Sequence, residues 1–121
     1  MAAEGLRPHP GASGEDRACA WLEAHGYRIV ERNWRCRSGE VDVVARQGAT
    51  TVFVEVKERR TAEHGLGLEA VTWSKRRRMI RAATLYAASR GLTESPLRFD
   101  VISVDGKTLR HEPGAFGADG S

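Results

Sequence analysis

Acidic residues interrupt two apolar segments of the chain, at residues 41–45 and 51–58. Asp42 lies inside the first segment, and Glu55 and Lys57 lie inside the second. A charge within a strand costs free energy unless it is paired or binds an ion. Carboxylates are ligands for Mg²⁺ or Mn²⁺, and a neighbouring lysine can hold a water or stabilise charge developing on phosphorus. These residue types suit phosphodiester hydrolysis, although Asp with Glu-x-Lys is a pattern of low specificity.

The spacing of these charges predicts that they meet on one face of a β-hairpin. Side chains two residues apart share a face of a strand, and residues 47–50 resemble a short hairpin connection. A turn centred between residues 48 and 49 pairs residues whose numbers sum to 97. Asp42 then lies opposite Glu55, and Glu40 lies opposite Lys57, with directly opposed Cβ atoms about 4.5–5.5 Å apart. Unless a bulge shifts the register, both carboxylates can reach one cation. The alternate positions are apolar and are expected to face the core (41, 43 and 45; 52, 54 and 56).

Positive charge is concentrated directly after this hairpin. The whole chain has a net charge of +3, but residues 57–81 carry +5 and the remainder −2. A surface of this kind suits phosphate groups, and the partner that it predicts is nucleic acid. A solvated helix face is the alternative explanation. The candidate nucleic-acid-binding residues are Arg59, Arg60, Lys75, Arg76, Arg77, Arg78 and Arg81.

Two helices are predicted to accompany the strands. Ser13 is a candidate N-cap, with Asp16 as its capping-box partner, for a helix over residues 14–25. Thr72 is a candidate N-cap for a long helix that ends near residue 91. The predicted strands cover residues 27–34, 41–45, 51–58 and 97–104, with a short strand near 108–111. Residues 59–67 are expected to form a loop.

The overall composition predicts a single globular domain. The chain has 121 residues, of which 40% are hydrophobic and 29% charged, which is ordinary for a soluble protein. No segment reaches transmembrane length and the N-terminus lacks a signal-peptide pattern, so the cytoplasm is the expected location. We expect a flexible leader over residues 1–12, a domain over 13–112 and a flexible tail over 113–121.

Short motifs spread over most of the chain make the interpretation more specific. They are Gly14-Glu15, Asn33, Gly39-Glu40-Val41-Asp42, Phe53-Val54-Glu55-Val56-Lys57 with Arg59, Ala70-Val71-Thr72 with Lys75, and Arg98-Phe99-Asp100-Val101. In order and spacing, these motifs resemble the YraN-type family of small bacterial proteins. That family is similar to the PD-(D/E)xK nuclease superfamily, and within it to archaeal Holliday-junction resolvases. The resemblance implies an α/β fold of the restriction-endonuclease-like type, with a mixed β-sheet flanked by helices.

The same resemblance implies a role for each site residue. Asp42 and Glu55 would bind the metal, Mg²⁺ or Mn²⁺, and Lys57 would be the catalytic lysine. Glu15 would complete the metal site, although a favourable interaction with the helix dipole is an equal alternative. Lys75 would support the site or bind phosphate. The proline that precedes the first acid in the superfamily is absent here, because Val41 stands in its place.

Two further acidic residues have structural explanations. Glu40 is expected to form a salt bridge with Lys57 or an arginine rather than bind the metal. Asp100 lies inside the strand at 97–104, where we expect a supporting role with Arg98 or with the long helix. Both residues therefore support the predicted site without carrying its chemistry.

The predicted function is a metal-dependent endonuclease that acts on DNA, with branched or structured DNA as a candidate substrate. By analogy with two-fold junctions, the resemblance favours a homodimer. The alternative is a non-catalytic nucleic-acid-binding or accessory protein that retains the fold. A third hypothesis is an interaction module whose basic helix binds an acidic protein.

Overall fold

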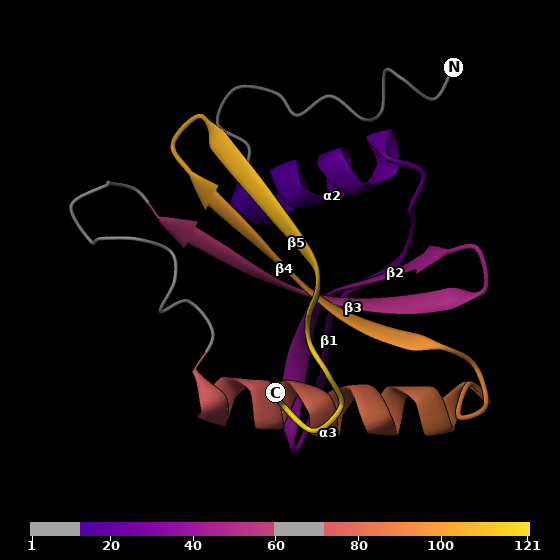
Figure 1. Cartoon of the computed structure of the whole chain (residues 1–121). Coiled ribbons are helices and arrows are strands. Elements are labelled where there is room, and N and C mark those ends of the chain that lie inside the picture. The colour runs from indigo at the N-terminus through magenta and orange to yellow at the C-terminus, as the bar shows by residue number, and fades with distance from the viewer. Residues whose placement is uncertain (1–12, 60–71) are drawn as a thin grey trace.

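A computed structural model describes residues 13–59 and 72–121 of the chain, which form a five-stranded sheet and two helices (Figure 1). The expected leader at 1–12, most of the expected loop at 59–67 and Arg60 lie outside the described residues. The elements follow in the order α2 (Gly14–Ala24), β1 (Arg28–Cys36), β2 (Gly39–Gln47), β3 (Thr50–Arg59), α3 (Trp73–Ser89), β4 (Leu97–Asp105) and β5 (Thr108–Phe116).

The strands lie side by side in the order in which they occur in the sequence. Neighbouring strands are antiparallel except β3 and β4, which are parallel and are linked through α3. A parallel pair needs a crossover connection of this kind. The fold is therefore mixed α/β and consistent with the restriction-endonuclease-like architecture that the sequence predicts.

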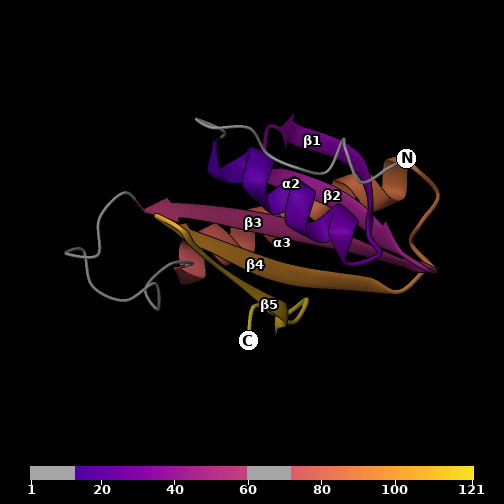
Figure 2. The same ribbon diagram turned by 90° about the horizontal axis from the view of Figure 1, so that it is seen from above.

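The two helices cover opposite faces of the sheet (Figure 2). The α2 side is filled by aliphatic residues such as Leu22 and Ile102, and the α3 side by aromatic residues such as Phe53 and Phe99. Apolar side chains on both faces of the central strands drive this burial. The sheet is thus the middle layer between two separate hydrophobic cores.

The predicted helix starts are confirmed. Ser13 accepts a hydrogen bond from the Asp16 backbone N–H, and the Asp16 side chain accepts one from the Ser13 backbone, which completes the capping box. Thr72 accepts a hydrogen bond from the Lys75 backbone N–H at 3.2 Å. Each cap satisfies a backbone donor that the helix leaves without a partner.

The predicted hairpin register is confirmed between β2 and β3. Val43 pairs with Val54 and Gln47 with Thr50, so paired residue numbers sum to 97. The pairing stops at Val43 and Val54, one position before Asp42 and Glu55. The two carboxylates therefore lie just past the paired part of the hairpin.

The last strand is longer than the sequence predicts. β5 runs to Phe116, so residues 113–116 belong to the sheet and not to a flexible tail. Phe116 is buried and stacks on Phe99 of β4, with ring centroids 5.1 Å apart. This distant contact gives the end of the strand a partner that local sequence does not reveal. Within the described residues, no helix is both long enough and apolar enough to cross a membrane.

Candidate functional site

The candidate site lies where β2 separates from β3. Beyond the last paired residues, the Asp42 carboxylate accepts a hydrogen bond from the Val56 backbone N–H at 2.8 Å. The Asp42 carboxylate thus satisfies a backbone N–H of β3 that would otherwise need a carbonyl acceptor on a neighbouring strand. This contact fixes one carboxylate oxygen of Asp42 against β3, immediately beside Glu55.

Next to Asp42, the side chains of both β1 and β2 switch from one face of the sheet to the other. Arg32 bonds to acidic residues of α2, whereas Trp34, two residues later, packs in the α3 core. In β2, Val43 packs in the α2 core and Val41 in the α3 core. The prediction that Val41 shares a core with Val43 is therefore wrong. Asn33 supplies the physical reason, because its φ of 54° breaks the regular alternation of β1.

Asn33 also connects Glu15 to the site. Its side-chain amide donates to Glu15 Oε2 at 3.0 Å, and Arg32 Nε donates to the same oxygen at 2.9 Å. These hydrogen bonds to Glu15 and Asp16 raise the pKa of Arg32. Asn33 lies between the paired residues that flank Asp42, so the first helix and β2 meet here. Glu15 is thus held at the edge of the site by two donors rather than directed freely into it.

The charge balance around Asp42 is unfavourable. Burial, followed by the negative charge of Glu55, raises the pKa of Asp42 to about 6. Glu40 and Glu15 raise it further, against the hydrogen bond from Val56. Glu55 is itself buried, with 8% of its surface exposed, and pairs with Lys75 Nζ at 3.1 Å. A cation bound beside both carboxylates would therefore stabilise them.

Lys57 lies two residues beyond Glu55 on β3, and strand alternation places it on the same face. It is partly buried and pairs in register with Ser103 of the parallel strand β4. A lysine on the carboxylate face is the arrangement that the sequence predicts, and its catalytic role stays a prediction.

The two supporting acids behave as expected. Glu40 pairs with Arg35 across the β1–β2 hairpin, with 3.0 Å between Oε1 and Nε. Both side chains are exposed, so this pair contributes little to stability. Asp100 pairs with Arg98, as predicted, and lies in a separate cluster on the α2 side of the sheet.

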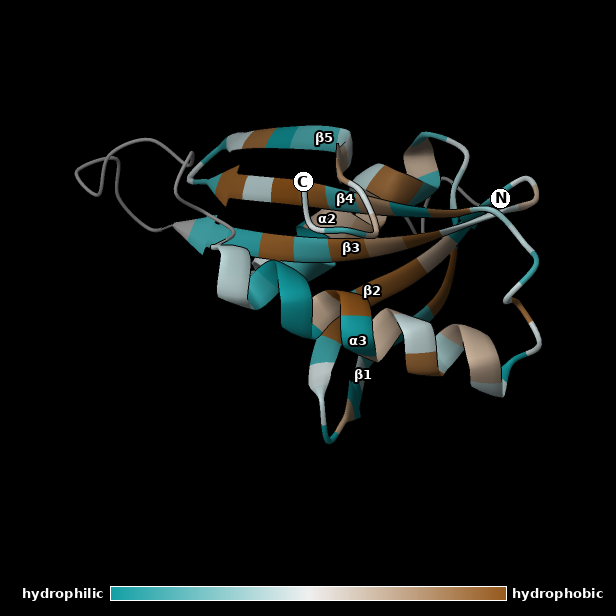
Figure 3. Ribbon diagram, turned by 60° about the horizontal axis from the view of Figure 1, so that its bottom comes forward, coloured by the Kyte–Doolittle hydropathy of each residue, from teal (hydrophilic) through white to brown (hydrophobic). Residues whose placement is uncertain are grey.

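The basic residues at the start of α3 have three different environments. Lys75 binds Glu55, whereas Arg76 donates to the Gly120 carbonyl at 2.8 Å and lies over the Phe116 ring. Arg76 is therefore engaged by the C-terminal segment. Arg77, Arg78 and Arg81 are exposed, and the first turns of α3, beside β3, consist mostly of hydrophilic residues (Figure 3). The Arg59 side chain and Arg60 lie outside the described residues.

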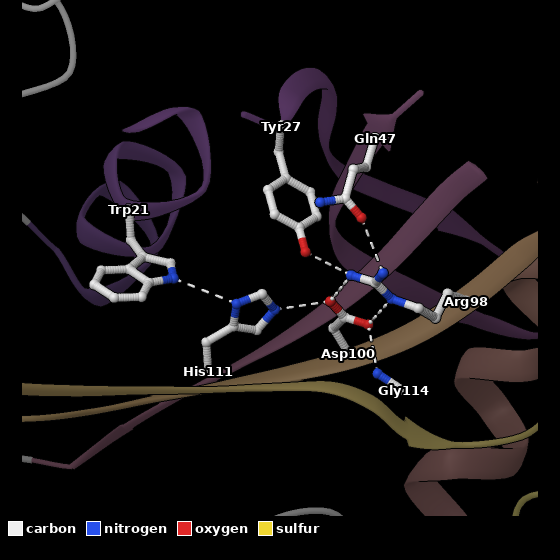
Figure 4. A network of polar contacts seen from close by, with 7 residues as sticks. All are labelled: Trp21, Tyr27, Gln47, Arg98, Asp100, His111 and Gly114. Atoms are coloured by element: carbon white, nitrogen blue, oxygen red, sulfur yellow. Dashed lines mark hydrogen bonds and ion pairs between the residues drawn. The ribbon is translucent and has the colours of Figure 1, made fainter. Parts of the chain in front are cut away.

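Asp100 is the centre of a second, closed cluster (Figure 4). It is fully buried and accepts hydrogen bonds from Arg98 Nε and Nη2, from His111 Nε2 and from the Gly114 backbone N–H, all within 2.8–2.9 Å. Burial alone would raise the pKa of Asp100, but these hydrogen bonds outweigh it and hold the pKa below its usual value.

The outer partners of this cluster connect it to α2 and β2. Trp21 Nε1 points at His111 Nδ1 at 3.3 Å, and an indole N–H can only donate. Nδ1 of His111 is therefore the acceptor, and its Nε2–H donates to Asp100. Arg98 also donates to the Tyr27 hydroxyl and to Gln47. The sequence patterns did not indicate His111 or Gly114, because the pairing of β5 with β4 brings them to Asp100.

The donor set at Asp42 fits a divalent cation. Two close carboxylates offer the oxygen ligands that Mg²⁺ and Mn²⁺ prefer, and the raised pKa of Asp42 indicates that their charges are incompletely balanced. Within residues 13–59 and 72–121, no three His, Cys, Asp or Glu side chains are grouped closely enough to hold a metal together. Asp42 and Glu55 are thus the candidate ligands, and Glu15 is bound to Arg32 and Asn33.

Comparisons with known proteins place the chain among a group of similar sequences. The sequence model described as "Uncharacterised protein family UPF0102" matches residues 14–104. A UPF0102 protein of Geobacter sulfurreducens is 48% identical over 111 residues, which cover 88% of this chain and 87% of the relative. One of Myxococcus xanthus is 45% identical over 121 residues, covering 97% and 96%, and one of Symbiobacterium thermophilum is 50% identical over 95 residues, covering 78% and 80%. All the motifs that surround Asp42 and Glu55 fall within the matched range.

Proposed function

The chain belongs to the uncharacterised protein family UPF0102, and from its candidate site we propose that it is a metal-dependent nuclease that hydrolyses DNA phosphodiester bonds. The observation that carries the proposal is the buried pair of Asp42 and Glu55. Burial, together with the negative charge of Glu55, raises the pKa of Asp42 to about 6, and a carboxyl group perturbed in this way is typical of functional sites. The basic start of α3 supplies the charge that a phosphate backbone requires.

Each residue has a distinct role in this proposal. Asp42 and Glu55 would hold Mg²⁺ or Mn²⁺, which when bound would supply Lewis-acid chemistry at the phosphate. Lys57, on the same face of β3, would orient the attacking water and stabilise negative charge on the phosphate oxygens. Lys75 pairs with Glu55 and holds its carboxylate in position. Asn33 and Arg32 hold Glu15 at the edge of the pair.

DNA is the proposed partner, and branched or structured DNA is the proposed substrate. The substrate class rests on the likeness of the motifs to junction resolvases and not on a contact within this chain. A homodimer, which would match a two-fold junction, stays a prediction on the same ground.

The second candidate function is a nucleic-acid-binding protein without catalysis. One observation favours it: the acidic side chains already have partners, with Glu15 bound to Arg32, Glu55 to Lys75 and Asp42 to the Val56 backbone. In that case DNA would bind with strong salt dependence and would stay intact with any metal.

The test is cleavage of labelled DNA by purified protein with Mg²⁺ or Mn²⁺, on linear, single-stranded and four-way-junction substrates. Asp42→Asn and Lys57→Ala should each lower the cleavage rate at least a hundredfold. Glu112→Gln is the matched control, because Glu112 is an exposed carboxylate on β5 that pairs only with Arg110 among the described residues. It should cleave like the wild type.

Two outcomes would contradict the nuclease. Equal cleavage by the wild type, Asp42→Asn and Lys57→Ala would show that the activity comes from a contaminant. Tight, salt-sensitive DNA binding with no cleavage of any substrate would favour the non-catalytic candidate.

A further inference from the structure

A hollow of about 330 Å³ opens beside the carboxylate pair, between the β1–β2 turn and the first half of α3. Its walls include Arg35, Arg37 and Glu40 of the hairpin and Glu55, Lys75 and Arg78 on the other side. This volume falls at the lower end of the range of ligand pockets, about 300–1,000 Å³. Because Glu55 belongs to its wall, the hollow is continuous with the candidate site.

The charges that line the hollow do not cancel. Arg35 is paired with Glu40, and Lys75 with Glu55. The side chains of Arg37 and Arg78 form no hydrogen bond or ion pair with any residue in the described part of the chain. Two arginines that line one hollow thus have no counter-charge among the described residues, and guanidinium groups bind phosphate oxygens through paired N–H donors.

The turn that carries Arg37 is seated closely against the helix that carries Arg78. A Cβ atom added at Gly39 would lie 2.5 Å from the Arg78 carbonyl oxygen, which is closer than such atoms approach. Only glycine permits this contact without a shift of the turn or the helix. The turn and the helix are therefore held in close contact beside the hollow.

We propose that the hollow is a phosphate subsite, in which Arg37 and Arg78 bind a DNA phosphate next to the one that is hydrolysed. Bound there, the phosphate sets the register of the strand over Asp42 and Glu55. The choice of the hydrolysed bond rests on the proposed nuclease function, whereas phosphate binding in the hollow does not. The phosphate is either an internal diester or a monoester at a strand end, and both offer the same oxygens to the arginines.

The test is DNA binding in the presence of a metal chelator, so that no cleavage intervenes. Fluorescence anisotropy would measure the affinity of a labelled oligonucleotide for the wild type, Arg37→Ala and Arg78→Ala at several salt concentrations. Each variant should weaken binding about tenfold at moderate salt and lower the slope of log K against log[salt] by about 1, as the loss of one phosphate contact predicts. Arg37→Gln repeats the test with a side chain of similar length.

The matched control is Arg28→Ala, which removes the same charge from an exposed position at the other end of β1. It should leave the salt slope unchanged. Thermal unfolding of each variant checks that the fold is retained. Oligonucleotides with a 5′-phosphate or a 5′-hydroxyl distinguish a terminal monoester from an internal diester. Tighter binding of the phosphorylated oligonucleotide, lost in Arg37→Ala, identifies a terminal monoester. Equal binding of both oligonucleotides identifies an internal diester.

The subsite is overturned if Arg37→Ala and Arg78→Ala bind DNA like Arg28→Ala, or if the wild type does not bind DNA. Its failure differs from that of the nuclease. DNA that is cleaved, with normal binding by both variants, would remove the subsite and leave the nuclease. DNA that is bound through both arginines but never cleaved would contradict the nuclease and support the subsite.

Discussion

Two aspartates inside the sheet have opposite environments. Asp100 in β4 is fully buried and receives four hydrogen bonds, and its pKa lies below the usual value. Asp42 in β2 receives one backbone hydrogen bond, and burial, together with the negative charge of Glu55, raises its pKa to about 6. A satisfied buried charge contributes to the fold, whereas a buried carboxyl group with a raised pKa is typical of a functional site.

The two clusters also differ in what they connect. The Asp100 cluster joins α2, β2, β4 and β5 through Trp21, Gln47, Arg98 and His111 (Figure 4). The Asp42 site lies where β2 and β3 part, next to an open, basic hollow. One cluster closes a core, and the other opens towards solvent. The following predictions test this contrast.

The largest effect is expected from Asp100→Asn. The substitution keeps the size of the side chain but removes the charge opposite Arg98 and turns an amide N–H₂ towards donors. Breaking a buried pair in this way typically costs about 3–5 kcal/mol. Urea unfolding should show this loss, with Asp105→Asn, at the end of the same strand, within about 0.5 kcal/mol of the wild type. A loss below 1 kcal/mol for Asp100→Asn would contradict the structural role.

Asp42→Asn should stabilise the fold, whereas Asp100→Asn should destabilise it. Because the folded pKa is about 6 and the ordinary value about 3.9, the folded state binds the proton more tightly, and ionisation destabilises the fold as pH rises from about 4 to 6. The variant cannot ionise, so it should be about 1–2 kcal/mol more stable than the wild type at pH 8, after allowance for solvent screening. The difference should vanish near pH 4. Destabilisation at pH 8 would mean that Asp42 is a structural residue like Asp100.

The contribution of Asp100 to stability should depend on pH in the opposite direction to that of Asp42. Its folded pKa is lowered, so its contribution to stability is complete above the ordinary value of about 3.9 and is lost as pH falls through the lower folded value. The wild type minus Asp100→Asn stability difference should therefore shrink only in acid, below about pH 4. Urea unfolding at pH 2.5, 4 and 7 measures it. A difference that is constant from pH 7 to pH 2.5 would contradict the ionised pairing.

A smaller effect is expected at Asn33, whose φ of 54° is unfavourable for most residues. Asn33→Gly and Asn33→Ala both remove the hydrogen bond to Glu15, but only alanine is strained at this φ. Alanine should therefore be about 1 kcal/mol less stable than glycine by urea unfolding. Equal stability of the two variants would show that the left-handed conformation of β1 is not required at this site.

The sequence predicted the parts of the site that depend on local pattern. The alternation in β2 and β3 and the two-residue turn at Gly48 and Ala49 determined the register up to Val43 and Val54, the residues next to Asp42 and Glu55. The helix caps at Ser13 and Thr72 followed equally from local chemistry. These features depend on neighbours within a few residues, so a single sequence contains them.

Features that depend on distant contacts could not be predicted. The change of face at Asn33 and Val41 appears only when α2 and α3 cover the two sides of the sheet. The hydrogen bond from Arg76 to the Gly120 carbonyl depends on the C-terminal segment. His111 reaches Asp100 because β5 pairs with β4. None of these contacts follows from the periodicity of a single strand or helix.

The central claim is that the Asp42 site, and not the Asp100 cluster, is prepared for a cation. Titration calorimetry of Mn²⁺ into the wild type, Asp42→Asn and Glu112→Gln tests it most directly. We expect one Mn²⁺ site per chain in the wild type and in Glu112→Gln, with affinity reduced at least tenfold in Asp42→Asn. No Mn²⁺ binding by the wild type, or equal binding by Asp42→Asn, would contradict it.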